Sequence, residues 1–333
     1  MSTHFPRPRI ATHAIAAAIC MVGTIAQISA VEPKKKPAAI SSEGDGDFII
    51  GPDYTKAPEM NAKDGVAKGD VKEFKMLSAD SKLYPGIQGA YERKVWVYIP
   101  KQYVAGTPAP FIIVQDGEGY VGRMRTALDN LIFEKRVPTM IAIMIDSGGS
   151  DGKGSQRGHE YDAVSAKYSE FIETEVLPRV AKDYKLTFTK DPEGRATMGC
   201  SSGAACAFTM AWFRPDLYRR VLSYSGTYVA QESPDNPASP HGAWEYHLNF
   251  IPKSEPKPLR VYLHVGDHDN GWDRTTGYHN WVQANIQMAA AMKAKGYHYR
   301  YEFAKNSGHC DGKVIEQTLP SALEWLWRGY PSK

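Results

Sequence analysis

The sequence predicts an α/β fold in which helices cover both faces of a mostly parallel central sheet. Short apolar runs of strand length alternate with longer stretches in which apolar residues recur at helical spacing. The short runs are almost continuously apolar, which is typical of strands that are buried on both faces. Strands and helices that alternate in this way form crossover units, and such units build parallel sheets.

The expected strands are rich in β-branched and aromatic residues, which pack well on a pleated surface. They cover residues 71–76, 94–100, 111–114, 138–145, 195–199, 220–224, 259–265 and 297–303. The expected helices cover residues 122–136, 161–185, 201–213, 281–295 and 314–327. Residues 229–257 show no periodicity and contain Pro and several aromatic residues, so we expect a cap or binding loop there.

The first thirty residues have the pattern of a signal peptide. Arg7 and Arg9 precede an apolar run over residues 10–28, and the small residues Ser29 and Ala30 suit a cleavage site. A permanent membrane anchor is the alternative, although polar residues interrupt the run. We therefore expect export to the periplasm or the medium, with no membrane contact after residues 1–30 are removed.

Composition and charge narrow the classes of partner. The chain has 333 residues, 42% of them hydrophobic, and a formal net charge of +3. Two of these charges lie in the expected signal peptide, so the rest of the chain is nearly neutral, and nucleic acid is not an expected partner. Residues 31–69 are rich in Lys, Pro and Gly and are expected to be a flexible lead-in to a folded domain at residues 70–333.

A G-x-S-x-G motif, Gly199-Cys200-Ser201-Ser202-Gly203, lies between an expected strand and an expected helix. This context is typical of a nucleophile elbow, a sharp turn that exposes the serine hydroxyl above the sheet. The motif therefore predicts Ser201 as a nucleophile and the Ser202 N–H as an oxyanion donor. The alternative is an ordinary Gly-Ser turn between a strand and a helix.

A serine nucleophile requires a base and an acid, which in this chain order follow in later loops. His309 comes after the last expected strand and is the candidate base. The loop after Val265 offers Asp269, Asp267 and Asp273 as acids. We prefer Asp269, because the first residues of such a loop turn away from the strand end; Asp267 is the rival.

A second oxyanion donor is expected from the loop after the 111–114 strand, at the N–H of Gly117 or Glu118. Trp281 and aromatic residues of the 229–257 loop are weaker candidates for substrate contacts. His264, His268 and His279 do not have the spacing of a closed metal site, so no metal is expected.

Two cysteines flank the candidate nucleophile and base. Cys200 precedes Ser201, and Cys310 follows His309. If Ser201 and His309 are within hydrogen-bonding reach, their neighbours are close enough for a disulfide, so we predict a Cys200–Cys310 bond. Cys206 is then a buried free thiol.

The chain resembles the enterochelin-esterase-like and esterase D branch of the α/β-hydrolases, which includes the family-one carbohydrate esterases such as feruloyl esterases. The resemblance covers roughly residues 71–331. The matching segments are residues 114–119, Arg157, 160–162, 175–178, 195–203, 207–212, 214–216, 221–226 and 323–328. It implies an α/β-hydrolase fold, a triad of Ser201, Asp269 and His309, and no cofactor.

The resemblance also bears on the substrate. Cysteines at positions 200 and 310 depart from the branch pattern and are similar to those of tannase-type feruloyl esterases and glucuronoyl esterases. We therefore expect an exported serine ester hydrolase that acts through an acyl-enzyme on carbohydrate-linked or aromatic esters, whether small molecules or polysaccharide-linked. The alternatives are a siderophore trilactone esterase or an acyltransferase on the same scaffold and, less favoured, a non-catalytic carbohydrate-binding module.

Overall fold

A computed structural model describes Met1 and residues 43–331 of the chain. Within these residues, nine strands form one sheet in the order β1-β9-β8-β7-β6-β4-β5-β3-β2. The strands are β1 Gly46–Ile50, β2 Asp70–Leu77, β3 Glu92–Ile99, β4 Phe111–Gln115, β5 Ile141–Ile145, β6 Arg195–Cys200, β7 Arg220–Tyr224, β8 Arg260–Gly266 and β9 His298–Ala304. β3 is antiparallel to both of its neighbours, β2 and β5, and the remaining pairs are parallel.

The strand order places two loops side by side. β4 lies between β5 and β6, so the chain leaves β4 toward one edge of the sheet and leaves β6 toward the other. A position where consecutive connections leave toward opposite edges of a sheet is a topological switch point. The carboxyl ends of the strands form a crevice there, and open α/β sheets bind their ligands in this crevice. The loops after β4 and β6 are therefore placed at a natural binding position.

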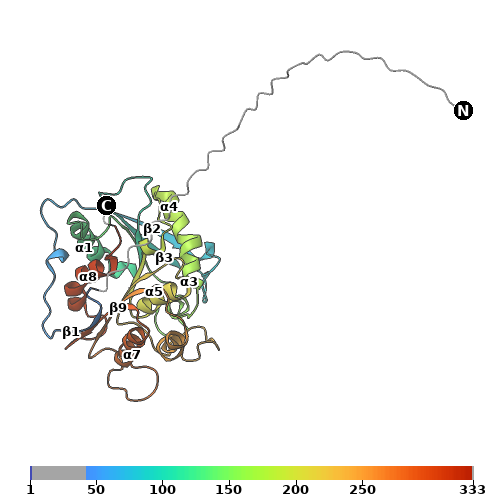
Figure 1. Ribbon diagram of the computed structural model, residues 1–333, viewed down its shortest axis with the longest axis vertical. Helices are drawn as coiled ribbons and strands as arrows, with labels where there is room; N and C mark the ends of the chain where they lie inside the picture. The colour runs from blue at the N-terminus through green and yellow to red at the C-terminus, as the bar shows by residue number, and fades with distance from the viewer. Residues whose placement is uncertain (2–42, 332–333) are drawn as a thin grey trace, which may run out of the picture. The chain divides into compact units, whose positions relative to one another are not determined.

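Helices cover both faces of the sheet, as predicted. α1 and α8 pack on one face, and α3, α4, α5 and α7 pack on the other; Figure 1 shows α1 and α8 on the side of the strands opposite α3 and α4. The helices are α1 Val121–Phe133, α2 Gln156–Tyr161, α3 Lys167–Phe171, α4 Leu177–Tyr184, α5 Ser202–Phe213, α6 Ile251–Lys253, α7 Trp281–Ala294 and α8 Gly312–Trp327. This arrangement confirms the predicted α/β-hydrolase fold.

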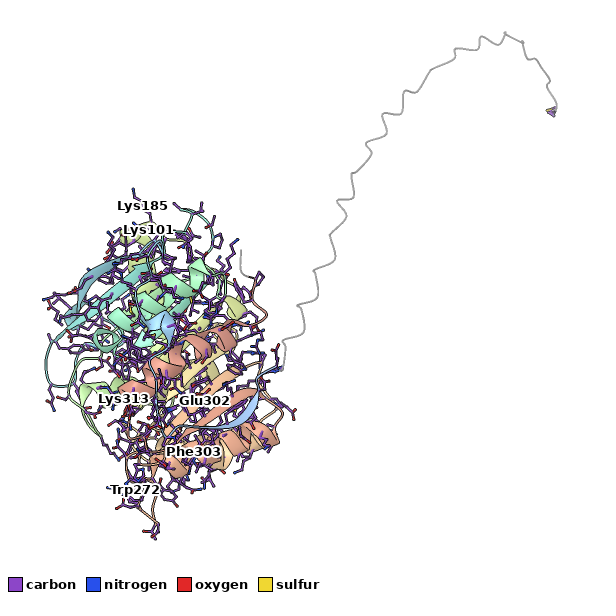
Figure 2. The ribbon with its side chains drawn as sticks, turned by 90° about the vertical axis from the view of Figure 1, so that its left-hand side faces the viewer. Lys101, Lys185, Trp272, Glu302, Phe303 and Lys313 are labelled. Carbon is purple, nitrogen blue, oxygen red and sulfur yellow. A yellow bond between two sulfur atoms is a disulfide. The ribbon has the colours of Figure 1, made fainter. Side chains whose placement is uncertain are left out.

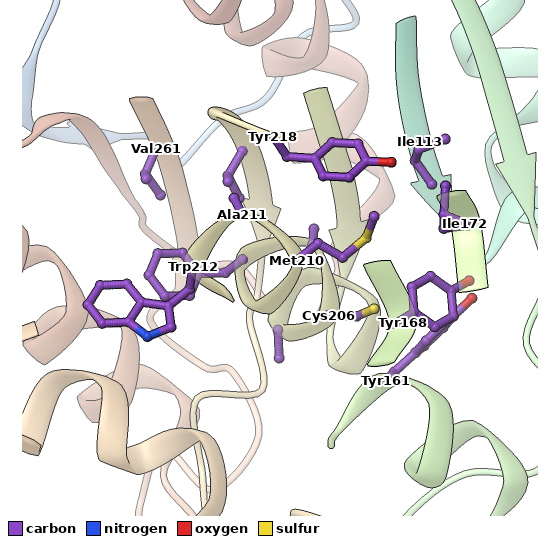
Figure 3. Close-up of a cluster of buried hydrophobic side chains, with 14 of the residues drawn as sticks. Ile113, Tyr161, Tyr168, Ile172, Cys206, Met210, Ala211, Trp212, Tyr218 and Val261 are labelled. Atoms are coloured by element: carbon purple, nitrogen blue, oxygen red, sulfur yellow. The ribbon is translucent and has the colours of Figure 1, made fainter. Parts of the chain in front are cut away.

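The helix α5 is the centre of one of the two cores. Its residues from Ser202 to Trp212 are all buried, and several are alanines, which let the helix lie close to the sheet. Figure 3 shows Met210 and Cys206 of α5 among Ile113 of β4 and aromatic side chains of the neighbouring elements. Because buried contacts surround α5, its first residue and the turn before it are held rigidly.

The predicted lead-in over residues 31–69 is wrong for its second half. Residues 46–50 form β1, which pairs in parallel with β9 at the edge of the sheet. Asp45 accepts a hydrogen bond from the Trp325 indole, and Asp47 accepts one from Tyr299. Alternate residues of this edge strand, Asp47 and Ile49, are exposed, so the strand is only partly buried. The predicted signal peptide at residues 1–30 lies outside the described residues, apart from Met1.

The predicted helix over residues 161–185 is wrong at its start, and a π-helical turn interrupts its α-helical hydrogen bonding. α2 ends at Tyr161, α3 begins at Lys167, and a π-helical turn at Ile172–Val176 leads into α4. Pro178 has no N–H to donate to the preceding turn, so the ladder shifts and the Leu177 N–H reaches Ile172 O. Among the helices at residues 43–331, none is long and apolar enough to cross a membrane.

Candidate active site

Ser201 occupies a strained turn between β6 and α5. Its φ of 58° and ψ of −130° lie in a region that a residue with a side chain rarely adopts. The turn is sharp enough that a Cβ on Gly199 would lie 2.3 Å from the carbonyl carbon of Gly203. Glycine is therefore required at position 199, and the motif has the local geometry that a nucleophile elbow needs.

Two backbone hydrogen bonds hold this turn in place. The Ser201 N–H donates to Tyr224 O at 3.0 Å, and the Thr227 N–H donates to Ser201 O at 3.1 Å. Both partners come from the end of β7 and the loop that follows it. These bonds and the buried helix α5 explain how the chain keeps a strained conformation at this position.

His309 and Asp269 are in direct contact. His309 Nδ1 lies 2.5 Å from Asp269 Oδ1, and the Asp269 side chain is fully buried. The same carboxylate oxygen accepts a hydrogen bond from the Asn270 N–H at 2.7 Å. A carboxylate at Nδ1 favours the tautomer with its proton on that nitrogen, which leaves Nε2 able to accept another proton.

The other two candidate acids lie elsewhere. Asp267 Oδ1 contacts His268 Nδ1 at 2.8 Å and accepts a hydrogen bond from the Ser307 N–H at 3.2 Å. Burial opposes the ionisation of Asp267, but the hydrogen bonds from His268 and from backbone N–H groups outweigh it and lower the pKa of this carboxyl. Asp273 is exposed. The geometry thus favours Asp269 as the partner of His309.

Two backbone amides are available as oxyanion donors. Ser202 begins the twelve-residue helix α5, where N–H groups have no partner within the helix. On the neighbouring loop after β4, the Glu118 N–H donates to Asp146 Oδ1 at 3.0 Å. The Gly117 N–H donates to none of the described residues, so the structure favours Gly117 over Glu118 as the second donor.

An ion pair holds the Gly117 loop against α5. The Arg157 side chain of α2 binds both carboxylate oxygens of Asp116, at 3.1 and 2.8 Å. A Cβ on Gly203 would lie 3.0 Å from Asp116 Oδ2, so the loop packs directly against the start of α5. Because Arg157 is largely buried, this bidentate pair restrains the loop more strongly than an exposed ion pair would.

A shallow groove of about 440 Å³ reaches Cys200 and Cys310, the neighbours of Ser201 and His309. The lining residues come from the loops after β4 and β5, from Tyr120 and Arg123 at the start of α1, and from Ile315. The groove contains both signs of charge, because Arg123 lines it together with Asp116, Glu118 and Asp146, and Asp116 and Glu118 are paired with Arg157 and Lys94. Burial raises the pKa of Asp146 above its usual range.

Cys200 and Cys310 form a disulfide whose Cα atoms are 6.2 Å apart, and the bond closes a separation of 110 residues. It joins the loop that carries Ser201 to the loop that carries His309. Cys206 is a buried free thiol. Cys200 and Cys310 are adjacent in sequence to Ser201 and His309, so the disulfide restrains the distance between these two residues.

Removing this disulfide should destabilise the protein and misplace His309. For a loop of this length, the chain-entropy model gives about 4.7 kcal/mol. We expect the Cys200→Ser/Cys310→Ser variant to melt at a clearly lower temperature and to hydrolyse esters more slowly. Cys206→Ala is the matched control, because it removes the remaining thiol without breaking a crosslink. Equal melting temperatures for the double variant and the oxidised wild type would contradict this prediction.

The candidate substrate contacts differ from expectation. Trp281 is only 8% exposed, and its ring packs edge-on against His309 at a centroid distance of 6.2 Å. Trp244 and Tyr246 of the 229–257 loop are also buried. The exposed aromatic residues in this region are Trp272 and Tyr278, on the loop after β8 that carries Asp269. Figure 2 shows Trp272 at the end of the folded part opposite Lys101 and Lys185.

Sequence reasoning missed two side chains next to the motif. Thr227 Oγ1 lies 3.3 Å from Ser201 Oγ and is the hydrogen-bonding partner of that hydroxyl within the described residues. The second side chain, Asp162, lies near Ser202. Gln231 Nε2 donates hydrogen bonds to both Asp162 Oδ2 and Ser202 Oγ. Burial raises the pKa of Asp162 to about 6. Thr227 follows the strand beside β6, a position that could have drawn attention to it.

Within residues 43–331, no three His, Cys, Asp or Glu side chains come together in a group suited to a metal ion. His264 is fully buried on β8, and burial lowers its pKa to about 4. His268 is paired with Asp267.

Three solved structures show the same fold at low sequence identity. The enterobactin esterase FES from Shigella flexneri, solved with enterobactin, is 20% identical with a TM-score of 0.59, over 78% of this chain and 58% of FES. The CE1 ferulic acid esterase AmCE1/Fae1A from Anaeromyces mucronatus is 15% identical with a TM-score of 0.59, over 84% and 98% of the two chains. Another ferulic acid esterase is 19% identical with a TM-score of 0.58, over 79% and 100%.

The chain thus spans less than two thirds of the length of FES. No curated protein matches the sequence. The model of the Esterase family ("Putative esterase") matches residues 90–325, which include every element from β4 to β9 and most of α8. The chain therefore belongs to the Esterase family.

Proposed function

We propose that the protein is an exported serine esterase that uses Ser201 as nucleophile, His309 as base and Asp269 as acid. One observation carries this proposal. The buried Asp269 carboxylate contacts His309 Nδ1 at 2.5 Å, and a disulfide joins the next residue, Cys310, to the residue before the strained Ser201 turn. Export is supported by the basic and apolar pattern of residues 1–30.

The proposed reaction has two steps. The Ser201 proton moves to His309 Nε2 while Oγ bonds to the ester carbon, and the carbonyl electron pair moves to the oxygen. The Ser202 and Gly117 N–H groups bind this oxyanion, and Asp269 stabilises the imidazolium. The alcohol leaves with the proton from His309. Water then attacks the acyl-enzyme by the same route and frees the acid and Ser201.

We propose carbohydrate-linked or aromatic esters as the substrates. The structural neighbours include ferulic acid esterases. The exposed rings of Trp272 and Tyr278, on the loop that carries Asp269, can stack on a sugar or an aromatic acyl group.

A panel of four esters tests this substrate class. The panel contains methyl ferulate, p-nitrophenyl acetate, a glucuronate methyl ester and a catecholate trilactone. We expect methyl ferulate or the acetate to have the highest kcat/KM. A preference for the trilactone would contradict the proposed substrate class while leaving the serine mechanism in place. Transfer of the acyl group to an added alcohol in preference to water would identify an acyltransferase.

A further inference from the structure

Thr227 touches both the main chain and the side chain of Ser201. It lies on the turn after β7 and is 1% exposed. Its N–H donates to Ser201 O at 3.1 Å, and its Oγ1 lies 3.3 Å from Ser201 Oγ. The second contact joins two hydroxyl groups, so the direction of the hydrogen bond depends on what else Thr227 Oγ1 binds.

A hydrogen bond from Trp281 bears on the direction of the Thr227–Ser201 hydrogen bond. Its indole Nε1–H donates to Thr227 Oγ1 at 3.1 Å. An indole nitrogen is a donor only, so Thr227 Oγ1 accepts this bond, and its own hydrogen is free for another acceptor. Ser201 Oγ is the acceptor within reach. No other acceptor for the Thr227 hydrogen is found among the described residues, which favours a chain of donors from Trp281 through Thr227 to Ser201.

Helix α7 holds this chain of donors in place. Trp281 is the first residue of α7 and is buried against the His309 ring. One turn later, Asn285 Nδ2 donates to Gly226 O at 2.9 Å, next to Thr227. Asn285 is fully buried. The orientation of the Thr227 hydroxyl is therefore determined by buried groups and not by solvent.

We propose that Thr227 is a positioning residue that donates a hydrogen bond to Ser201 Oγ and leaves the serine hydrogen free for His309. This inference rests on the proposed nucleophilic function of Ser201. As Oγ bonds to the ester carbon, its proton passes to His309 Nε2, and the carbonyl electron pair moves onto the carbonyl oxygen. The Thr227 hydrogen bond orients Oγ and stabilises negative charge that builds on it before the bond to carbon forms.

Two substitutions at position 227 distinguish the effect of the hydroxyl group from the effect of the side chain's shape. Thr227→Val removes the hydroxyl and keeps the branched shape, and Thr227→Ser keeps the hydroxyl. Thr209→Val is the matched control, because Thr209 is also buried and its Oγ1 bonds Tyr246 Oη at 2.7 Å, away from Ser201. The measurements are kcat and KM for p-nitrophenyl acetate, the rate of covalent labelling of Ser201 by a fluorophosphonate, and the melting temperature.

We expect Thr227→Val to lower kcat and the labelling rate by about tenfold, the effect of one hydrogen bond, with KM unchanged. Thr227→Ser should regain most of both rates. Thr209→Val should lose stability but keep both rates. Wild-type rates in Thr227→Val, or rates in Thr227→Ser as low as those of Thr227→Val, would overturn the proposal. A wild-type protein that the fluorophosphonate does not label at Ser201 would overturn the proposed function itself, and this inference with it.

Discussion

Ser201→Ala is expected to lower kcat by roughly a millionfold for every ester that the wild type hydrolyses, the size of effect seen when a serine nucleophile is removed elsewhere. The substitution deletes the only hydroxyl on the strained turn between β6 and α5. The nearby Thr227 hydroxyl cannot replace it, because Thr227 already bonds Trp281 and lies beside the turn and not on it. The measurement is kcat with p-nitrophenyl acetate and methyl ferulate.

The fold should survive this substitution. Alanine occupies the same strained backbone region as serine at a similar cost, and the two backbone bonds to Tyr224 and Thr227 do not involve the side chain. Ser169→Ala is the control, since Ser169 is a buried serine on α3 whose hydroxyl bonds only Met210 O in the structure. Turnover by Ser201→Ala close to that of Ser169→Ala would refute the nucleophile assignment.

Asp269→Asn is expected to lower kcat by roughly 10⁴-fold, while Asp267→Asn should change it little. The Asp269 carboxylate accepts the Nδ1 proton of His309 and stabilises the imidazolium that forms when Ser201 loses its proton. An amide at this position presents an N–H to Nδ1, which favours the wrong tautomer. The two variants differ by two positions on one loop, so they make a matched pair.

The measurement is kcat for both variants at one pH, with circular dichroism to check the fold. Asp267 binds His268 and the Ser307 N–H, so its replacement should affect the stability of the loop more than the reaction. A large loss of kcat in Asp267→Asn with normal turnover in Asp269→Asn would reverse the assignment of the acid.

The features that sequence reasoning anticipated depend on local chain geometry. Gly199 is required by the close packing of the turn, and Gly203 is favoured by the close approach of Gln115 and Asp116. The motif around Ser201 is therefore visible in five consecutive residues. The positions of the inner strands β4 to β8 were predicted from continuous apolar runs, because these strands are buried on both faces. The choice of Asp269 over Asp267 also came from the position of each residue in its loop.

The features that were missed depend on contacts between distant segments. β1 becomes a strand because β9, some 250 residues later, offers a free edge and a tyrosine that binds Asp47. Its apolar residues Phe48, Ile49 and Ile50 form a run too short to identify a strand among the polar residues around it. Thr227 reaches Ser201 because β7 lies beside β6 in the sheet. The sequence places Thr227 after the 220–224 strand but does not show that its side chain faces Ser201, so tertiary structure was needed to find both contacts.

Trapping the acyl-enzyme is the most direct test of the central claim that Ser201 forms a covalent intermediate. The protein would be mixed with p-nitrophenyl acetate or a fluorophosphonate, quenched in acid, digested and examined by mass spectrometry. The predicted result is an adduct on the peptide that contains Ser201, absent in Ser201→Ala and slower to form in Asp269→Asn. Ester hydrolysis by the wild type with no adduct, or with an adduct on another residue, would contradict the proposed mechanism.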